Sequence, residues 1–194
     1  MLNSHTHYKL FKPYGYLSQF VYNQATRKNK KLLGELYNFE EGTMAIGRLD
    51  ETSEGLLLLT TNGKLSKLIL SRKVEKEYYV QVDGEITAEA IETLKDGVEI
   101  SVYGKPYQTL KCKARKLEEI PAFPERAKAI RSEKHGPTTW ISITLKEGKF
   151  RQVRKMTAKV GFPTLRLVRY RVGNETCEGM NAGEVKPVDK FNYA

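Results

Sequence analysis

The chain has 194 residues, with 33 Lys or Arg against 23 Asp or Glu, which gives a formal net charge of +10 at pH 7. No stretch of about 18 consecutive apolar residues is present, so we expect no membrane-spanning helix, and the N-terminus lacks the basic-then-apolar order of a secretory signal. The length allows one domain with a sizeable core, or two small lobes that share one sheet. The positive charge favours a polyanionic partner, most often nucleic acid and less often a membrane surface.

The cysteines and histidines indicate neither a metal site nor a disulfide framework. Cys112 and Cys177 lack metal-ligand spacing, and the three histidines are scattered along the chain. We therefore interpret the cysteines as isolated thiols in a reducing cytosol, and we predict a cytoplasmic protein without a bound metal.

The N-terminal part is predicted to begin with a loose tail over residues 1–7, followed by a strand, a turn and a strand over residues 8–17. Pro13 restrains φ in this turn, and Gly15 can adopt a positive φ. A basic run comes next, and it is either a solvated surface loop or a contact with RNA. Its members are Arg27, Lys28, Lys30 and Lys31.

Two predicted strands then surround a polar turn. Residues 44–50 predict a strand that ends at Asp50, and residues 56–61 are a short apolar run that is typical of a buried strand. Asn62-Gly63 indicates a turn. Apolar residues then recur at helical spacing, at Leu65, Leu68 and Ile69.

The middle of the chain has one clear strand and one clear helix. Residues 77–83 predict a strand with Tyr78, Val80 and Val82 on one face. Thr87 is a suitable cap for a helix that continues to about residue 96.

Less regular sequence follows this helix, which Gly97 is expected to end. Residues 109–117 are a further strand candidate. Residues 121–137 contain three prolines and little periodicity, and we predict a long loop of the kind that is often functional.

The C-terminal part predicts a strand over residues 140–145, a helix that Gly161 ends, and a long strand over residues 164–172. The apolar stripe of this helix consists of Phe150, Val153, Met156, Thr157 and Val160. Because strands and helices alternate irregularly and several strands show period-two patterning, we predict an α+β fold with a mixed or largely antiparallel sheet.

Positive charge is concentrated in residues 146–171. This segment contains nine Lys or Arg and one acid, Glu147. Most of the basic residues fall on the predicted helix and the strand after it, so they form a patch and not a tail. These residues are Lys146, Lys149, Arg151, Arg154, Lys155, Lys159, Arg166, Arg169 and Arg171.

Asp50 is the first candidate for chemistry. In a strand, Arg48 and Asp50 would face outward together while Leu49 faces inward. A nearby guanidinium favours the ionised carboxylate, which can attack carbon or accept a proton. Taken alone, however, Asp50 is more simply explained as the residue that starts a turn.

Tyr78 and Arg154 are the other two candidates. The ring of Tyr78 shares a face with apolar residues, so it could stack on a base or serve only as a core tyrosine. Arg154 borders the apolar stripe of the basic helix, where it could turn toward a carboxylate or remain on a solvated face.

Four phrases together resemble the pseudouridine synthases, specifically the branch that acts on ribosomal RNA. They occur in the order of that family, and the resemblance covers residues 8–173. The phrases are Lys12-Pro13-Tyr14-Gly15; Gly47-Arg48-Leu49-Asp50 with Ser53-Glu54-Gly55-Leu56-Leu57; Lys76-Glu77-Tyr78; and Glu147-Gly148-Lys149 with Arg151-Gln152-Val153-Arg154-Lys155-Met156.

The resemblance implies a single catalytic domain over residues 1–194, with a bent mixed sheet, flanking helices and a central cleft. It implies that Asp50 is the catalytic carboxylate, that Tyr78 packs against the target base, and that Arg154 pairs with the acid. No cofactor is implied. RNA contacts are expected from Arg48, Lys12, Lys149, Arg151, Lys155, Arg166 and Arg169.

The expected reaction is isomerisation of a specific uridine in 23S rRNA. Because the first matching phrase begins near Tyr8, we expect no S4-type RNA-binding domain, so the catalytic domain itself would recognise RNA. We expect a monomer. The alternatives are a small-subunit rRNA pseudouridine synthase, a non-catalytic rRNA-binding or assembly factor, and a glycosidase that would release free uracil.

Overall fold

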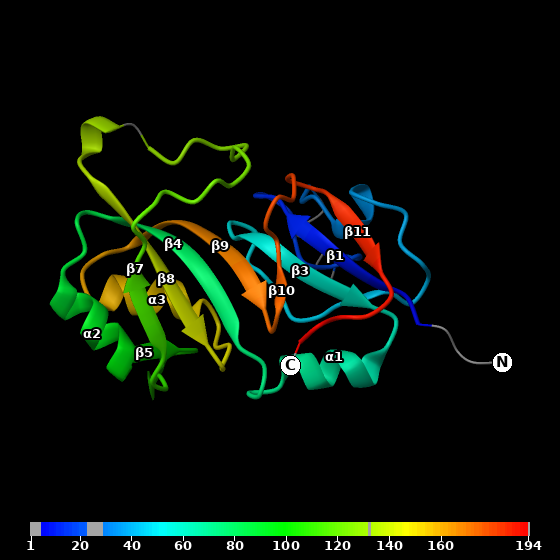
Figure 1. Ribbon diagram of the computed structural model, residues 1–194, viewed down its shortest axis with the longest axis horizontal. Coiled ribbons are helices and arrows are strands. Elements are labelled where there is room, and N and C mark those ends of the chain that lie inside the picture. The colour runs from blue at the N-terminus through cyan, green and yellow to red at the C-terminus, as the bar shows by residue number, and fades with distance from the viewer. Residues whose placement is uncertain (1–4, 23–28, 132, 194) are drawn as a thin grey trace.

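The computed structural model describes residues 5–22, 29–131 and 133–193. A nine-stranded sheet runs through the molecule, with helices on its flanks (Figure 1). Seven strands follow the order β11-β1-β3-β9-β4-β8-β7, β2 pairs with β3, and β10 pairs with β9. The strands are β1 His7–Lys12, β2 Met44–Ala45, β3 Glu54–Thr60, β4 Lys76–Asp83, β7 Lys113–Lys116, β8 Thr138–Leu145, β9 Thr164–Val172, β10 Glu175–Thr176 and β11 Val185–Val188.

Within the described chain, each pairing in this sheet is antiparallel except the parallel pairing of β3 with β9. The predicted α+β fold with a mixed, mostly antiparallel sheet is therefore confirmed. The remaining elements are the hairpin of β5 Glu99–Val102 and β6 Lys105–Gln108, the helices α1 Gly63–Leu70, α2 Ala88–Asp96 and α3 Gln152–Lys159, and the 3-10 turns η2 Leu33–Glu35 and η3 Glu133–His135.

The two halves of the sheet have separate cores. On one half, α2 and α3 cover β4 and β8 through residues such as Leu94, Met156 and Ile141. On the other half, β3 is buried along its whole length, with Leu56 and Leu58 facing one apolar cluster and Leu57 and Leu59 facing another. Strand β9 contributes Leu167 to the first cluster and Val168 and Val172 to the cluster of Leu56 and Leu58, and its pairing with β3 joins the two halves of the sheet.

Gly55 makes this central pairing possible. It has φ +102°, and a Cβ at this position would lie 2.4 Å from the carbonyl oxygen of Arg169. The absence of a side chain lets β3 approach β9 with Gly55 opposite Arg169. Arg166 of β9 also makes a buried, two-pronged ion pair with Glu54 of β3, with N–O distances of 2.9 and 3.1 Å.

Several predicted elements are confirmed. The capped helix begins at Ala88, where the Thr87 side chain accepts a hydrogen bond from the amide of Ala90, and Gly97 follows its end at φ +90°. The long strand predicted over residues 164–172 is β9, with the same bounds, and the strand with Val80 and Val82 on its buried face is β4.

Other predictions were wrong in their bounds. The strand predicted over residues 44–50 stops at Ala45, because Gly47 turns the chain with φ +74°. The predicted tail ends before His7, which begins β1. The stretch 109–117 contributes only β7, and the hairpin of β5 and β6 was not predicted. Residues 1–4 of the tail and Arg27 and Lys28 of the basic run lie outside the described residues.

The segment between β7 and β8, which includes the predicted loop 121–137, contains the short turn η3 and projects beyond the sheet in Figure 1. Its Phe123 packs against Tyr79, Trp140 and Tyr170 on the face of the sheet opposite the α2–α3 core. Among the described residues, none of the helices combines the length and the apolar composition that spanning a membrane requires.

Candidate active site

Asp50 lies in the turn that leads into β3. A buried serine restrains this turn through hydrogen bonds to its backbone. The Ser18 hydroxyl donates to the carbonyl of Leu49 at 2.8 Å and accepts from the amide of Leu49 at 2.9 Å. Leu49 itself is buried, and the amide of Ser53 closes the turn on the carbonyl of Asp50 at 3.0 Å. The backbone on both sides of the carboxylate is therefore restrained, although it is not the strand edge that the sequence predicted.

Lys12 supports the same turn from inside the protein. Its Nζ donates to the carbonyl oxygens of Pro13 and Tyr16 at 2.9 and 2.7 Å, and it lies 3.5 Å from that of Glu51. Burial lowers the pKa of Lys12 to about 7, against the raising effect of nearby acids such as Asp50. The predicted RNA contact by Lys12 is wrong, because the side chain is fully buried and engaged by backbone.

Two arginines from the other half of the molecule approach the Asp50 carboxylate. Arg151 Nη1 lies 3.1 Å from Asp50 Oδ2, and Arg154 Nε lies 3.9 Å from the same oxygen. Arg154 Nη2 also donates to the carbonyl of Thr52 at 3.0 Å. The expected proximity of Arg154 to Asp50 is present, but Arg151 makes the shorter contact.

The two guanidiniums differ in environment. The Arg154 side chain is 13% exposed, and that of Arg151 is 39% exposed. Burial and then the neighbouring charge of Arg151 lower the pKa of Arg154, while Asp50 acts in the opposite direction. Among the described residues, Arg154 Nε is buried without a hydrogen-bond acceptor, so it is available to an acid that moves slightly closer.

A polar network sets the position of Arg151, and the sequence analysis did not identify it. Glu147 is buried and accepts from Tyr107 Oη at 2.5 Å, from the amide of Leu110 at 2.8 Å and from Gln152 Nε2 at 2.7 Å. Gln152 Oε1 in turn accepts from the amide of Lys149 at 3.0 Å. The sequence did contain one indication of this network, because Glu147 is the one acidic residue among the nine Lys and Arg residues of the segment 146–171.

This network holds a tight turn before α3. Arg151 adopts φ 53° and ψ 33°, a left-handed conformation that a non-glycine residue adopts at a cost. The turn directs Arg151 toward Asp50 and leaves Phe150 outside the helix and half exposed, contrary to its predicted place in the apolar stripe.

A small cavity of about 70 Å³ lies beside the Asp50 carboxylate. Tyr78 of β4 lines it together with apolar residues from both halves of the sheet, and Arg48 and Arg151 line it as well. The structure thus brings an acid, a tyrosine ring and guanidiniums to one small cavity. Its apolar lining residues are Leu49, Leu145, Val153 and Leu167.

The basic residues predicted to contact RNA separate into two groups. Arg166 and Arg169 are buried, Arg166 in its ion pair with Glu54 and Arg169 through a 2.8 Å hydrogen bond from Nε to the carbonyl of Leu56. Their predicted RNA contacts are therefore wrong. The side chains accessible to solvent are Arg48, Lys149, Arg151 and Lys155.

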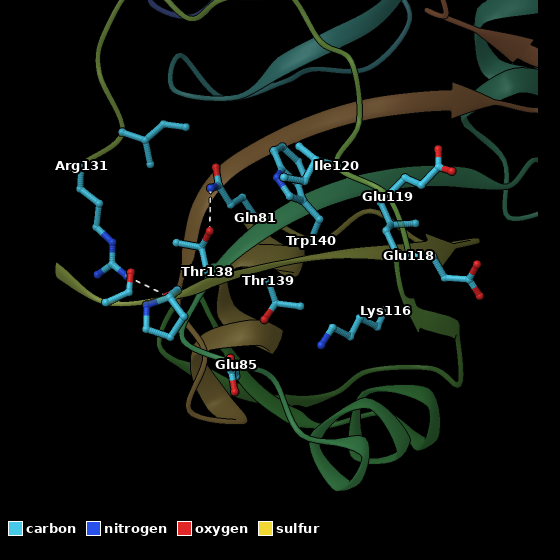
Figure 2. A pocket seen from close by; sticks show the side chains of 14 residues that line it. Gln81, Glu85, Lys116, Glu118, Glu119, Ile120, Arg131, Thr138, Thr139 and Trp140 are labelled. Carbon is cyan, nitrogen blue, oxygen red and sulfur yellow. Dashed lines mark hydrogen bonds between the residues drawn. The ribbon is translucent and has the colours of Figure 1, made fainter. Parts of the chain in front are cut away.

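A larger hollow, of about 740 Å³, lies under the long loop and away from Asp50. Figure 2 shows Trp140, Gln81 and Thr138 on its floor and Arg131 at its edge. None of the predicted site residues lines this hollow, so size alone does not identify the candidate active site. Over the described ranges, no group of three or more His, Cys, Asp or Glu is arranged to hold a metal ion.

The sequence and the fold are both similar to those of one known family. Residues 7–159 match the family model described as RNA pseudouridylate synthase, and the chain belongs to this family. A crystal structure of a pseudouridylate synthase has the same fold, with a TM-score of 0.74 and 23% sequence identity over 95% of this chain and 70% of that chain.

Relatives with higher sequence identity include ribosomal large subunit pseudouridine synthases. The chain is 41% identical over 179 residues to ribosomal large subunit pseudouridine synthase E of Vibrio vulnificus. The aligned residues cover 91% of this chain and 72% of the relative. It is 40% identical over 167 residues to the protein of the same name from Xanthomonas axonopodis pv. citri, covering 85% of this chain and 84% of the relative.

Proposed function

We propose that the protein isomerises a specific uridine of 23S rRNA to pseudouridine. In this reaction the bond from N1 of uracil to C1′ of ribose breaks, the base rotates, C5 becomes bonded to C1′ and loses its proton, and N1 gains a proton. Atoms and electrons balance within the nucleotide, so the reaction needs neither a redox partner nor a second substrate. The large-subunit substrate is proposed from the names of the relatives that align over most of this chain.

Asp50 is the proposed catalytic carboxylate. Two routes are open to it, attack on C1′ or removal of a proton from C2′, and both need an ionised carboxylate within reach of the ribose. The single observation that carries this assignment is the position of Asp50 beside the small cavity, with its side chain 26% exposed and two guanidiniums within 3.9 Å.

Tyr78 and the apolar residues beside it are proposed to receive the uracil ring. A uridine in paired RNA has to leave the stack before an enzyme can act on its base. Arg48 is exposed and lines the cavity, and its proposed role is to occupy the space that the base leaves.

The cavity has to widen when RNA binds. Its volume of about 70 Å³ is far below the roughly 300 Å³ or more of ordinary small-molecule sites. Arg151 is the more exposed of the two arginines at Asp50, and a phosphate could draw it outward. Arg154, whose Nε has no acceptor among the described residues, would then take over as the partner of Asp50.

The proposal is tested with 23S rRNA incubated with wild-type protein, Asp50→Asn and Asp96→Asn, followed by pseudouridine mapping. We expect modification at one uridine by the wild type and by Asp96→Asn, which makes the same chemical change at an exposed acid of α2. Asp50→Asn should reduce the rate by on the order of a thousandfold or more, with little change in RNA affinity.

Other outcomes identify the alternatives. Modification of 16S rRNA alone would assign the protein to the small subunit, and release of free uracil would indicate a glycosidase. If neither the wild type nor Asp50→Asn modified any rRNA or ribosomal precursor while both bound RNA, the protein would be a non-catalytic RNA-binding factor and not an enzyme. We further propose that the protein acts in the cytoplasm as a monomer, which sedimentation at low concentration tests.

A further inference from the structure

Two large aromatic side chains near the candidate active site are exposed to solvent and stacked on each other. Tyr103 is 81% exposed and Phe150 is 50% exposed. Their ring centroids lie 5.6 Å apart with an interplanar angle of 17°. Because exposed apolar surface of this kind is unfavourable in water, a pair held in this way needs an explanation beyond stability.

Tight backbone turns hold both rings at exposed positions. Tyr103 has φ 52° in the two-residue turn of the hairpin formed by β5 and β6, a position at which Asn or Gly is usual. Phe150 directly precedes Arg151, which also has a positive φ. Each ring is therefore placed by a tight turn that carries some backbone strain, and neither is part of the core.

One lysine contacts the aromatic pair, and a second lies over a neighbouring tyrosine ring. Lys155 Nζ lies 5.1 Å from the centroid of Phe150 and donates to the carbonyl of Ser101 at 2.6 Å, so it links α3 to the hairpin. Lys149 Nζ lies 4.5 Å from the centroid of Tyr107. Aromatic faces interleaved with cations are the combination that binds unpaired nucleotides, because bases stack on the rings and phosphates meet the charges.

Phe150 is adjacent in sequence to residues that line the cavity at Asp50. Gly148, Lys149 and Arg151, which flank Phe150 in sequence, line that cavity. On the other side, a hollow of about 650 Å³ lies between the hairpin and α3, and its charged lining residues are Lys155, Lys159 and one acid, Glu99. A strand of RNA leaving the cavity can therefore pass over the two rings and continue along α3.

We propose that Tyr103 and Phe150 form a stacking platform for unpaired nucleotides next to the target uridine. This inference rests on the proposed function for the identity of the RNA, and it adds a binding site outside the catalytic residues. The charges favour RNA over a protein partner, because Lys155 lies over Phe150, Lys149 and Arg151 flank Phe150 in sequence, and Glu147, the acid of this turn, is buried.

Binding of short RNA probes tests the platform without depending on catalysis. The probes are a mixed-sequence single-stranded RNA of 12 nucleotides and the duplex of the same sequence, both measured by fluorescence anisotropy. Tyr103→Ala and Phe150→Ala should each weaken binding of the single strand by about tenfold, the usual effect of losing one base stack. Duplex binding should change less than twofold, and Tyr103→Phe should bind as the wild type does.

The control is Ile120→Ala, which removes an 82% exposed apolar side chain from the long loop and should leave both affinities unchanged. The proposal is overturned if the two alanine variants bind the single strand as the wild type does, or if they lose single-strand and duplex binding equally. Retained RNA binding with loss of a protein partner would also overturn it.

The measurement separates this inference from the proposed function. If the wild type fails to modify rRNA and the alanine variants still lose single-strand binding selectively, the platform stands and the proposed reaction fails. If the wild type modifies rRNA and the variants bind the single strand normally, the reaction stands and the platform fails.

Discussion

The backbone beside Asp50 is restrained by one buried side chain. Ser18 uses one hydroxyl to restrain both the amide and the carbonyl of Leu49, and Leu49 is the residue before the acid. A backbone shift of about 1 Å at a reacting group can reduce a rate a hundredfold. We therefore assign Ser18 as a positioning residue for the carboxylate.

Replacing Ser18 with Ala should lower kcat by about tenfold or more while leaving KM for RNA nearly unchanged, because the carboxylate is misplaced and the RNA surface is intact. Steady-state kinetics on rRNA measure both constants. Ser142→Ala is the matched control, since it also removes a buried hydroxyl, which donates to Glu77 at 2.7 Å away from the Asp50 turn. An equal loss of kcat in both variants would show that Ser18 acts only through general stability.

Among the secondary-structure elements, the pairing of β3 with β9 determines how the residues of the candidate site come together. Asp50 lies four residues before β3, while Arg151 and Arg154 belong to the turn and helix that lead into β9. Because β3 and β9 are parallel, the segments that precede them meet at the same edge of the sheet. The Asp50 carboxylate and the two arginines therefore come together only when the two halves of the sheet join.

Gly55→Ala should disturb this junction. A Cβ there would lie 2.4 Å from a backbone oxygen at φ +102°, and we expect the free energy of unfolding to fall by at least about 2 kcal/mol. Gly42→Ala is the control, because Gly42 has φ +79° with nothing within 4 Å of the added Cβ.

Urea unfolding of both variants measures the difference. The control should lose only the smaller cost of a positive φ, about 1 kcal/mol. Equal losses in the two variants would mean that the close approach of the strands contributes nothing.

For the whole molecule, the net charge is +10. Some of the basic residues behind this charge are buried in the interior, and others lie on the surface. Lys12, Arg166 and Arg169 are buried and bind backbone oxygens or Glu54. Lys149 and Lys155 lie on the surface near the cavity. Net charge thus indicates a polyanionic partner, but it overstates the number of cations that can reach phosphate.

Salt dependence distinguishes these two roles. Removing one phosphate contact by Lys149→Gln should reduce the slope of log affinity against log salt by about 0.7 for single-stranded RNA. Lys64→Gln, an exposed change on α1, should leave the slope unchanged. Titrations of RNA binding between low and moderate salt supply both slopes, and equal slopes in the two variants would remove Lys149 from the phosphate contacts.

Local patterns predicted most elements well. The apolar run in β3, the alternation around Val80 and the cap at Thr87 each depend on neighbours a few residues away, and the structure has a strand, a strand and a helix there. The hairpin of β5 and β6 was missed because its residues are mostly exposed and carry little apolar periodicity. The bounds near Gly47 were wrong because one positive φ ends a strand.

The amino-acid sequence alone was sufficient for the mixed α+β fold and the family resemblance, since each depends on local pattern or on short phrases. It also nominated Asp50, Tyr78 and Arg154, whose catalytic roles stay predictions. Contacts across about a hundred residues were not predictable in this way. The chain order does not tell which of several arginines lies nearest Asp50, or that Arg166 and Arg169 are buried while Tyr103 and Phe150 are exposed. Those facts follow from the pairing of β3 with β9 and from two tight turns, because packing assigns each side chain its surroundings.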